Sequence, residues 1–322
     1  MVTTVDYHTE GEPFRIVSGG VPPLVGRSIL EKRRYALEHL DHIRQLLVFE
    51  PRGHADMYGG FVTEPEDDGA QLGVVFFHNA GYSTACGHGT IALVTWAIEA
   101  AIVPAGGSTV EVVVDVPSGR LVTVATMQQG RVQSVRFRNV PSFVLFDNLR
   151  VALETRVLEV AVAYGGAFYA IVPADRFALP IEPAFVPRFV ELGREIKAAI
   201  EAQQSIVHPL QQDLEGIYGV IFTSANRNVT VFADGEIDRS PCGSGTSARL
   251  ALMDRRGELA RGAALMHESV IGTRFVGRVV AEDRVGDLPA VITEVEGSAY
   301  LTGYHQFVLS AYDPIGTGFL IR

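Results

Sequence analysis

The sequence predicts an α/β protein composed of two similar domains. Its 322 residues exceed the usual size of a single domain. Strand-like apolar runs alternate with a few segments of helical periodicity in both halves of the chain. The motif Cys-Gly-x-Gly-Thr-x-Ala occurs at residues 86–92 and again at 242–248, in each case after strand-like runs and before a helix-like segment. We therefore expect two domains related by pseudo-symmetry, with a ligand bound in the cleft between them.

The first half is expected to contain two helices. Between residues 28 and 47, apolar side chains recur every three to four positions, and Ser28 followed by Glu31 matches a capping box. Residues 87–102 are apolar on nearly every side, so this second helix is expected to be buried. Strands are expected at residues 3–7, 14–17, 61–63, 72–77, 110–116, 121–126 and 132–138.

The second half repeats this plan of strands around a few helices. Helices are expected at residues 187–203 and 246–255, and Gly257 ends the second of them. Strands are expected at residues 157–164, 167–172, 219–223, 229–232, 270–280, 290–295, 298–302 and 307–310.

The domain organisation follows from the two halves. Pro141 marks the expected passage from one domain to the other. The N-terminal domain is expected to comprise residues 1–138 and 305–322, and the C-terminal domain residues 139–304. Each domain would then contain one cysteine turn with the helix that follows it.

Composition and charge argue against several classes of function. The formal net charge is −10 and the pI is near 5.4, so the chain lacks the clustered basic surface that nucleic acid requires. The start of the chain resembles no signal peptide, and no apolar run is long enough to span a bilayer. We expect a cytoplasmic protein with no nucleic-acid or membrane partner, whose two cysteines stay reduced.

The two cysteine turns combine an anion site with a tuned thiol. The start of a helix presents unpaired N–H groups and a partial positive charge. The small residues Gly87, Gly243 and Ser244 allow a carboxylate to approach these N–H groups closely. The same field stabilises a thiolate, so we expect lowered pKa values for Cys86 and Cys242. Taken singly, each cysteine is equally well explained as a buried, inert side chain.

Two such turns facing one substrate would support proton transfer at an α-carbon. One thiolate would remove the α-proton, and the opposing thiol would return a proton from the other face. The backbone N–H groups would stabilise the carbanion through the substrate carboxylate. Asp238 is expected to pair with a substrate ammonium, unless it caps the helix or pairs with Arg239. His88 is expected to contact the same nitrogen or to orient a neighbouring group.

Motifs for cofactors and metals are absent from the sequence. It contains no dinucleotide-binding glycine fingerprint, no phosphate-binding loop, no zinc-protease motif and no pair of cysteines with zinc-site spacing. Its two lysines, Lys32 and Lys197, lie outside glycine-rich segments, which argues against a pyridoxal phosphate enzyme. We therefore expect a reaction that uses neither a cofactor nor a metal ion.

At several places the sequence resembles the proline racemase family. The matching segments are Gly-Tyr-x-x-x-Cys-Gly-His at 81–88, Asp-Arg-Ser-Pro-Cys-Gly-x-Gly at 238–245, Thr-Glu-Gly-Glu-Pro-Phe-Arg at 9–15, Glu-Pro-Arg-Gly-His-Ala-Asp-Met at 50–57 and Gly-Gly-Ala-Phe at 165–168. This family includes proline racemases, hydroxyproline 2-epimerases and trans-3-hydroxyproline dehydratases. The resemblance implies the diaminopimelate-epimerase-like fold, with two domains that each curve a sheet around a central helix. It also implies an active site between the domains, chemistry without a cofactor, an imino acid substrate and, commonly, a homodimer.

The resemblance also assigns roles to individual residues. It implies that Cys86 and Cys242 are the two bases, and that His88 and Asp238 contact the amino group. The residues implied to bind the carboxylate through their backbone are Gly87, His88, Gly243 and Ser244. Tyr58 and Phe232 are implied to form the walls of the pocket around the pyrrolidine ring.

Two details bear on which branch of the family the chain resembles. Dehydratases of the family have threonine where this chain has Cys242, so a second base favours a racemase or 2-epimerase. Tyr58, where racemases have phenylalanine, and Gly-Tyr-Ser-Thr at 81–84 are instead similar to the dehydratases. A tyrosine hydroxyl suits a hydroxylated substrate. We therefore expect a hydroxyproline 2-epimerase or proline racemase. The alternatives are a trans-3-hydroxy-L-proline dehydratase that uses Cys86 alone, and a redox or ligand-binding protein whose two cysteines form a reversible disulfide.

Overall fold

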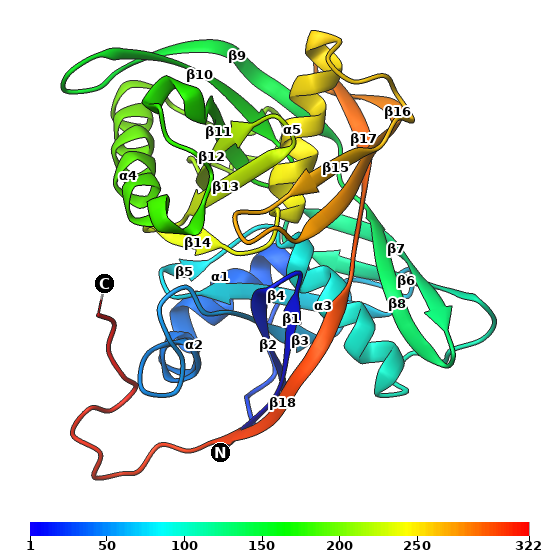
Figure 1. The fold of residues 1–322 in the computed structure, drawn as a ribbon. Helices are drawn as coiled ribbons and strands as arrows, with labels where there is room; N and C mark the ends of the chain where they lie inside the picture. The colour runs from blue at the N-terminus through cyan, green and yellow to red at the C-terminus, as the bar shows by residue number, and fades with distance from the viewer. Residues whose placement is uncertain (322) are drawn as a thin grey trace. The chain divides into compact units, whose positions relative to one another are not determined.

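The computed structural model describes residues 1–321, which form two compact units (Figure 1). The first unit contains Met1–Arg136 together with the chain from Ser298 onward, and the second contains Phe137–Gly297. The expected domain boundary between residues 304 and 305 falls inside the last strand, β18 (Ala299–Phe307), all of which belongs to the first unit.

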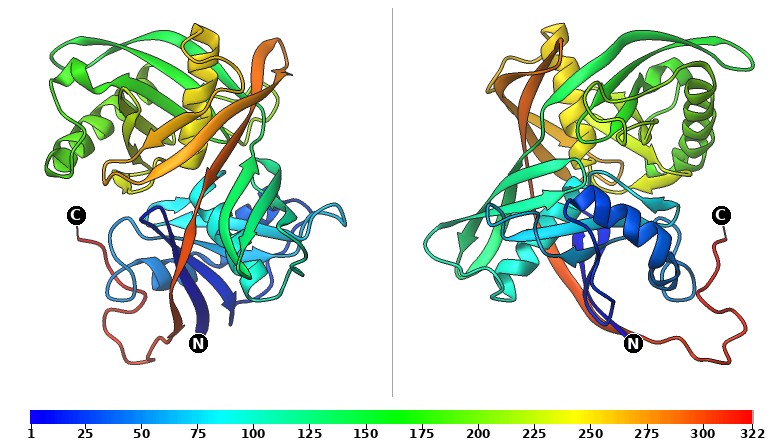
Figure 2. Two further views of the ribbon diagram at one scale, coloured as in Figure 1. Left: turned by 45° about the vertical axis from the view of Figure 1, so that its right-hand side comes forward. Right: turned by 180° about the vertical axis from the view of Figure 1, so that it is seen from behind.

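The first unit is a sheet that curves around one buried helix. Its strands pair in the order β18, β1, β2, β3, β4, β6 and β7, with parallel pairing between β2 and β3 and between β4 and β6. The strands of this unit are β1 (Val2–Thr9), β2 (Glu12–Gly19), β3 (Tyr58–Thr63), β4 (Leu72–His78), β5 (Gly81–Tyr82), β6 (Thr109–Val116), β7 (Gly119–Gln128), β18 and most of β8 (Arg131–Arg138), whose last two residues belong to the second unit. Both views of Figure 2 show β18 running beside β1, and the two strands pair along their whole length.

The central helix of this unit is α3 (Gly87–Glu99), which begins directly after Cys86. Every side chain from Gly87 to Ile98 is buried, as the apolar sequence predicted. The helix packs against β1, β2, β7 and β18. Its first turn is therefore held by strands that are distant from it in the sequence.

The second unit is a closed ring of strands around a second buried helix. Pairing runs through β9, β10, β11, β12, β13, β15, β16 and β17, and returns from β17 to β9. The strands of this unit are β9 (Ser142–Ala152), β10 (Val157–Tyr164), β11 (Phe168–Pro173), β12 (Gly219–Ser224), β13 (Arg227–Phe232), β14 (Glu236–Asp238), β15 (Leu265–Glu268), β16 (Arg274–Val285) and β17 (Leu288–Gly297). The helix α5 (Gly243–Arg256) begins directly after Cys242 and packs against β9, β10, β11, β16 and β17. Two units that each curve strands around one central helix confirm the expected fold class.

The remaining helices lie outside these central positions. In the second unit, α4 (Val186–Gln203) packs on β9, β12 and β13, and follows two short 3₁₀ helices, η1 (Ala174–Phe177) and η2 (Pro183–Phe185). In the first unit, α1 (Ile29–His39) and α2 (Asp41–Val48) pack against β4. No helix within residues 1–321 is both long enough and apolar enough to cross a membrane.

Two expectations about these elements were wrong. The single helix expected at residues 28–47 is two helices that meet at Leu40. The N–H of Leu40 still bonds to Ala36, but Asp41 starts a new helix and its carboxylate accepts from Arg44 and Gln45 in the first turn of α2. The apolar spacing continues across this break, so periodicity alone did not reveal it. The strand expected at residues 307–310 is also absent, because β18 ends at Phe307.

Candidate active site

Cys86 is the N-cap residue of α3, and its sulfur acts as a hydrogen-bond acceptor. The N–H of Gly89 donates to Cys86 Sγ at 3.2 Å, and the hydroxyl of Thr90 donates to the Cys86 carbonyl at 2.9 Å. The side chain is 5% exposed. A Cβ atom at position 89 would lie only 2.7 Å from Cys86 Sγ and closer still to the ring of Phe14. Glycine at this position therefore lets the sulfur accept from the start of the helix.

His88 lies beside this sulfur as a neutral ring. Both of its ring nitrogens are 3.5 Å from Cys86 Sγ. The ring of Tyr58 stands edge-on to it, with centroids 4.8 Å apart and planes at 84°. Burial lowers the pKa of His88 to about 3. At neutral pH the imidazole is therefore uncharged, and it contributes at most one ring N–H to the sulfur.

Tyr58 begins β3 and is buried opposite His78 of β4. Its hydroxyl forms a short hydrogen bond with the hydroxyl of Ser83. Ser83 lies in the turn between β5 and Cys86 and is 2% exposed. Tyr58, which is expected to form a pocket wall, is thus hydrogen-bonded to Ser83. Ser83 comes from the segment that precedes the Cys86 turn. Sequence reasoning quoted Ser83 within a motif but gave it no role.

The turn at Cys242 is built differently, although its sequence matches the first. Cys242 has φ +64°, a left-handed conformation that is uncommon for residues with a side chain. Its N–H donates to the Ser240 hydroxyl at 3.1 Å, and the Thr246 hydroxyl donates to its carbonyl at 2.8 Å. Its sulfur lies 3.5 Å from the hydroxyl of Tyr169 and near the N–H of Gly245, which counteracts in part the rise of its pKa. The two cysteines therefore begin similar helices with different hydrogen bonding at sulfur.

Asp238, at the end of β14, is a buried carboxylate beside this turn. Its Oδ1 atom accepts from the Ser240 N–H at 2.8 Å and from the Ser240 hydroxyl at 2.7 Å. Burial raises its pKa to about 6, against the effect of these two donors. The N-cap of α5 is Cys242 and not Asp238, so the capping role considered for Asp238 does not apply.

The pKa of Cys242 lies well above the usual range of a thiol. Burial is the main cause, and the negative charge of Asp238 raises the pKa further. The expected lowering by the helix field is wrong for this residue, because desolvation and the neighbouring carboxylate outweigh it. At neutral pH Cys242 is a thiol, which suits a proton donor better than a resting base.

Aromatic side chains lead from Cys242 to Phe232, the other expected pocket wall. Phe232 stacks on Tyr218 with centroids 5.6 Å apart, and Tyr218 stands edge-on to Tyr169 at 5.8 Å. The Tyr169 hydroxyl also lies 2.7 Å from the hydroxyl of Ser244 in the first turn of α5. Sequence reasoning missed Tyr169. Its signal was its position directly after the Gly-Gly-Ala-Phe segment at 165–168.

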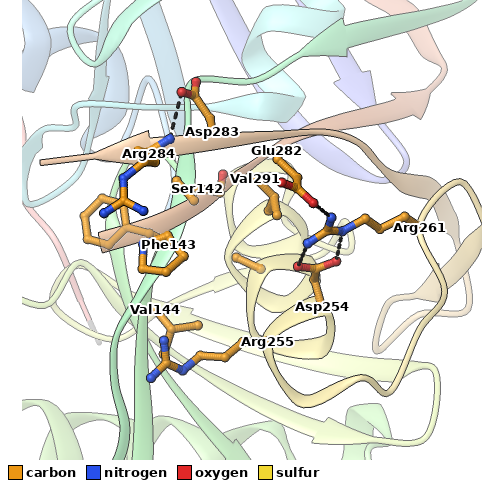
Figure 3. Close-up of a pocket in the computed structure, with 13 residues that line it drawn as sticks. Ser142, Phe143, Val144, Asp254, Arg255, Arg261, Glu282, Asp283, Arg284 and Val291 are labelled. Carbon is orange, nitrogen blue, oxygen red and sulfur yellow. Dashed lines mark hydrogen bonds and ion pairs between the residues drawn. The ribbon is translucent and has the colours of Figure 1, made fainter. Parts of the chain in front are cut away.

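A cavity of about 720 Å³ lies at the opposite end of α5 from Cys242 (Figure 3). Buried apolar side chains such as Phe143 and Val291 line it, together with charged groups at its edge. One of these, Arg261, forms an ion pair with Asp254 at 2.6 Å and another with Glu282. None of the expected site residues lines this cavity. Within residues 1–321, no three His, Cys, Asp or Glu side chains are grouped so that they could hold a metal ion.

Comparison with known proteins connects these two cysteine turns to a family. The chain matches the model of the proline racemase family over residues 4–320. It is 42% identical to a trans-3-hydroxy-L-proline dehydratase of Bacillus cereus over 326 residues, which cover 99% of this chain and 98% of the relative. It is 45% identical to a 3-hydroxyproline 2-epimerase of Burkholderia multivorans over 331 residues, which cover 100% of this chain and 98% of the relative.

Solved structures agree with this assignment. A hydroxyproline epimerase of Agrobacterium vitis with bound trans-4-hydroxy-L-proline has a TM-score of 0.94 and 29% identity, covering 99% of this chain and 95% of that one. A probable proline racemase of Agrobacterium radiobacter K84 with bound carbonate has a TM-score of 0.95 and 29% identity, covering 100% and 97%. A PhzF-family protein of Bacillus anthracis, 13% identical with a TM-score of 0.59, shares the fold alone, which is the diaminopimelate-epimerase-like fold expected from the sequence. The chain therefore belongs to the proline racemase family, and the isomerase class expected from its motifs is confirmed.

Proposed function

We propose that the protein is a cofactor-independent 2-epimerase of a hydroxyproline, with Cys86 and Cys242 as its two bases. The observation that carries this proposal is the pair of cysteines at the starts of two buried helices, one accepting at sulfur and the other present as a thiol. A racemase needs one acceptor and one donor of protons at the same time. The different surroundings of the two sulfurs supply both.

The reaction would begin with binding of the substrate carboxylate. The unpaired N–H groups at the starts of α3 and α5, from Gly87 and His88 and from Gly243 and Ser244, would hold it. The ionised Asp238 would pair with the substrate ammonium. The mechanism requires that both helix starts act on the same substrate molecule, one from each face of its α-carbon.

Proton transfer would then run from one sulfur to the other. The Cys86 thiolate takes the α-proton, and the electron pair of the C–H bond passes to the α-carbon and its carboxylate. The Cys242 thiol gives its proton to the opposite face, which inverts the centre. The enzyme is left with Cys86 as a thiol and Cys242 as a thiolate, ready for the reverse reaction. We assign the resting thiolate to Cys86 because the Gly89 N–H donates to its sulfur.

We further propose a 3-hydroxyproline as the substrate. The names of relatives that are 42–45% identical refer to 3-hydroxyproline. The buried hydroxyl pair of Tyr58 and Ser83 supplies polar groups that suit a hydroxylated ring better than plain proline. Trans-3-hydroxy-L-proline dehydration is the second candidate, because several relatives carry that name. The thiol at Cys242 favours epimerisation over this alternative.

Incubation with trans-3-hydroxy-L-proline, trans-4-hydroxy-L-proline and L-proline in deuterated water tests the proposal. We expect deuterium at Cα with inversion, fastest for the 3-hydroxy substrate, as followed by NMR and chiral chromatography. A pyrroline product without inversion would establish the dehydratase instead. Cys242→Ser should abolish inversion while the circular dichroism spectrum is unchanged, and full activity of this variant would contradict the two-base scheme.

We also propose that the protein works as a homodimer in the cytoplasm. Cys86 and Cys242 are both buried and are not joined in a disulfide, which suits a reducing compartment. Light scattering should give twice the mass of the chain. If the cysteines served a redox function instead, an oxidant would join them in a disulfide, and pyrrole-2-carboxylate would not protect them from thiol reagents.

A further inference from the structure

We infer that Tyr169 is a third catalytic group, whose hydroxyl accepts a hydrogen bond from the Cys242 thiol and donates one to the Cys242 thiolate after proton transfer. This inference rests on the proposed role of Cys242 as a proton donor. Its subject is the reacting sulfur itself, which Tyr169 contacts directly.

The position of the Tyr169 hydroxyl is closely fixed. The residue lies in β11, between Ala163 of β10 and Gly219 of β12, and its side chain is fully buried. The hydroxyl oxygen is 3.5 Å from Cys242 Sγ and 2.7 Å from Ser244 Oγ. A tyrosine held between two strands thus presents one hydroxyl to two groups of the same helix start.

The Cys242 sulfur has a particular need for such a partner. At Cys86 the Gly89 N–H donates to the sulfur, whereas at Cys242 the sulfur has the N–H of Gly245 near it and also lies against the carboxylate of Asp238, which raises the thiol pKa. After it delivers its proton, this sulfur would be a buried anion near the carboxylate of Asp238. A buried charge without a donor is strongly unfavourable. The Tyr169 hydroxyl is in a position to supply a second donor beside the N–H of Gly245.

Rotation of one hydroxyl would serve both states of the sulfur. In the resting enzyme the Cys242 S–H donates to Tyr169, and the Tyr169 O–H donates to Ser244. When the S–H bond breaks and the proton passes to the α-carbon, the Tyr169 O–H turns from Ser244 to the thiolate. One proton moves, from sulfur to carbon, and Tyr169 keeps its own. Burial raises the pKa of Tyr169 well above its usual value, so the hydroxyl remains a hydrogen-bond donor throughout.

Tyr169→Phe tests this role, because it removes the hydroxyl and keeps the ring. We expect kcat/KM for epimerisation to fall about 10- to 100-fold, in line with the loss of one donor to a developing anion. The fall should be equal in both directions, because the equilibrium constant between the epimers is fixed, and KM should change little. Tyr164→Phe is a matched control, because Tyr164 in the adjacent strand β10 has a buried hydroxyl without a hydrogen-bond partner. The control should retain activity within twofold.

A second measurement does not depend on turnover. In a Cys86→Ala background, the rate of Cys242 alkylation by iodoacetamide, followed by mass spectrometry at fixed pH, reports the thiolate fraction. Adding Tyr169→Phe should slow alkylation about tenfold, whereas adding Tyr164→Phe should leave it unchanged. Unchanged alkylation and unchanged kcat/KM in Tyr169→Phe would overturn the inference. If the wild-type protein inverts no substrate, the proposed function fails, but the alkylation rates still decide whether Tyr169 stabilises the thiolate.

Discussion

Asp238 and Cys242 are two acidic groups in contact in a buried site, where the carboxylate raises the pKa of the thiol and the hydrogen bond from the thiol lowers the pKa of the carboxyl group. The carboxylate accepts from Ser240 and from the Cys242 thiol, and we place the substrate ammonium of the proposed reaction beside it. A substrate ammonium at that position would lower the pKa of both groups, because a positive charge stabilises each anion. Binding of the substrate ammonium group would thereby make the Cys242 thiol more acidic and favour transfer of its proton.

This pairing predicts the acid limb of the pH profile. The pKa of Asp238 is about 6, so the carboxyl is neutral below that pH and cannot pair with an ammonium. We expect kcat/KM to rise with pH through about 6 and to level off above it. Asp238→Asn should lose most activity and lack this limb. A profile that stays flat between pH 5 and pH 7 in the wild-type protein would contradict the assignment.

The same carboxylate should reduce stability at neutral pH. Its folded pKa of about 6 exceeds the reference value of 3.8, so the folded state loses stability as the pH rises from about 4 to 6 and does not regain it above. The change in the free energy of unfolding caused by Asp238→Asn should therefore depend on pH. It should be more favourable to the folded state at pH 8 than at pH 4, by roughly 1–3 kcal/mol. Denaturant titration at both pH values measures this difference. Asp287→Asn, at an exposed position, is the matched control variant for the substitution itself.

At the scale of elements, the two cysteine turns show how far the sequence is informative. The repeated motif correctly predicted a helix after each cysteine turn, although α5 begins at Gly243 and not at residue 246 as expected. It did not reveal that the backbone of Cys86 is extended while that of Cys242 is left-handed. Identical residues adopt different conformations here because the strands around them differ. Tyr169 and Ser83 were missed for the same reason. Strand pairing brings the Tyr169 hydroxyl to Cys242, and a local turn brings the Ser83 hydroxyl to Tyr58. The spacing of these residues in the sequence does not predict either contact.

The glycines at the third position after each cysteine should not tolerate a side chain. A Cβ at Gly89 or Gly245 would lie 2.7 or 2.9 Å from the sulfur of the preceding cysteine, so the sulfur or the helix start must move. We expect Gly89→Ala and Gly245→Ala each to lower kcat/KM at least 100-fold, since small displacements of catalytic groups are costly. Gly106→Ala, where a Cβ meets no atom within 4 Å, is the control and should keep wild-type activity. Wild-type rates in either cysteine-turn variant would argue against that sulfur as a base.

At the scale of the whole chain, the main features of the fold were predictable from the sequence. The point at which the chain leaves the second unit and returns to the first was not. The repeat and the two apolar helices correctly indicated two units with central helices. Gly297 separates the strands expected at residues 290–295 and 298–302, but a single glycine does not show that the chain re-enters the first unit at this point. The pairing of β18 with β1, from Val2 opposite Phe307 to Thr9 opposite Ala299, assigns all of that strand to the first unit.

This return predicts that the first unit cannot fold from its N-terminal segment alone. β18 packs against α3 as well as β1, and α3 carries Trp96, the only tryptophan of the chain. Truncation after Gly297 should expose the α3 core and shift Trp96 fluorescence to longer wavelength, with loss of the cooperative unfolding that Trp96 reports. Truncation after Leu309 removes the ion pair of Arg52 with Asp313 but keeps β18, so it should leave the emission maximum unchanged. A buried, native-like Trp96 in the shorter chain would show that β18 is dispensable for this unit.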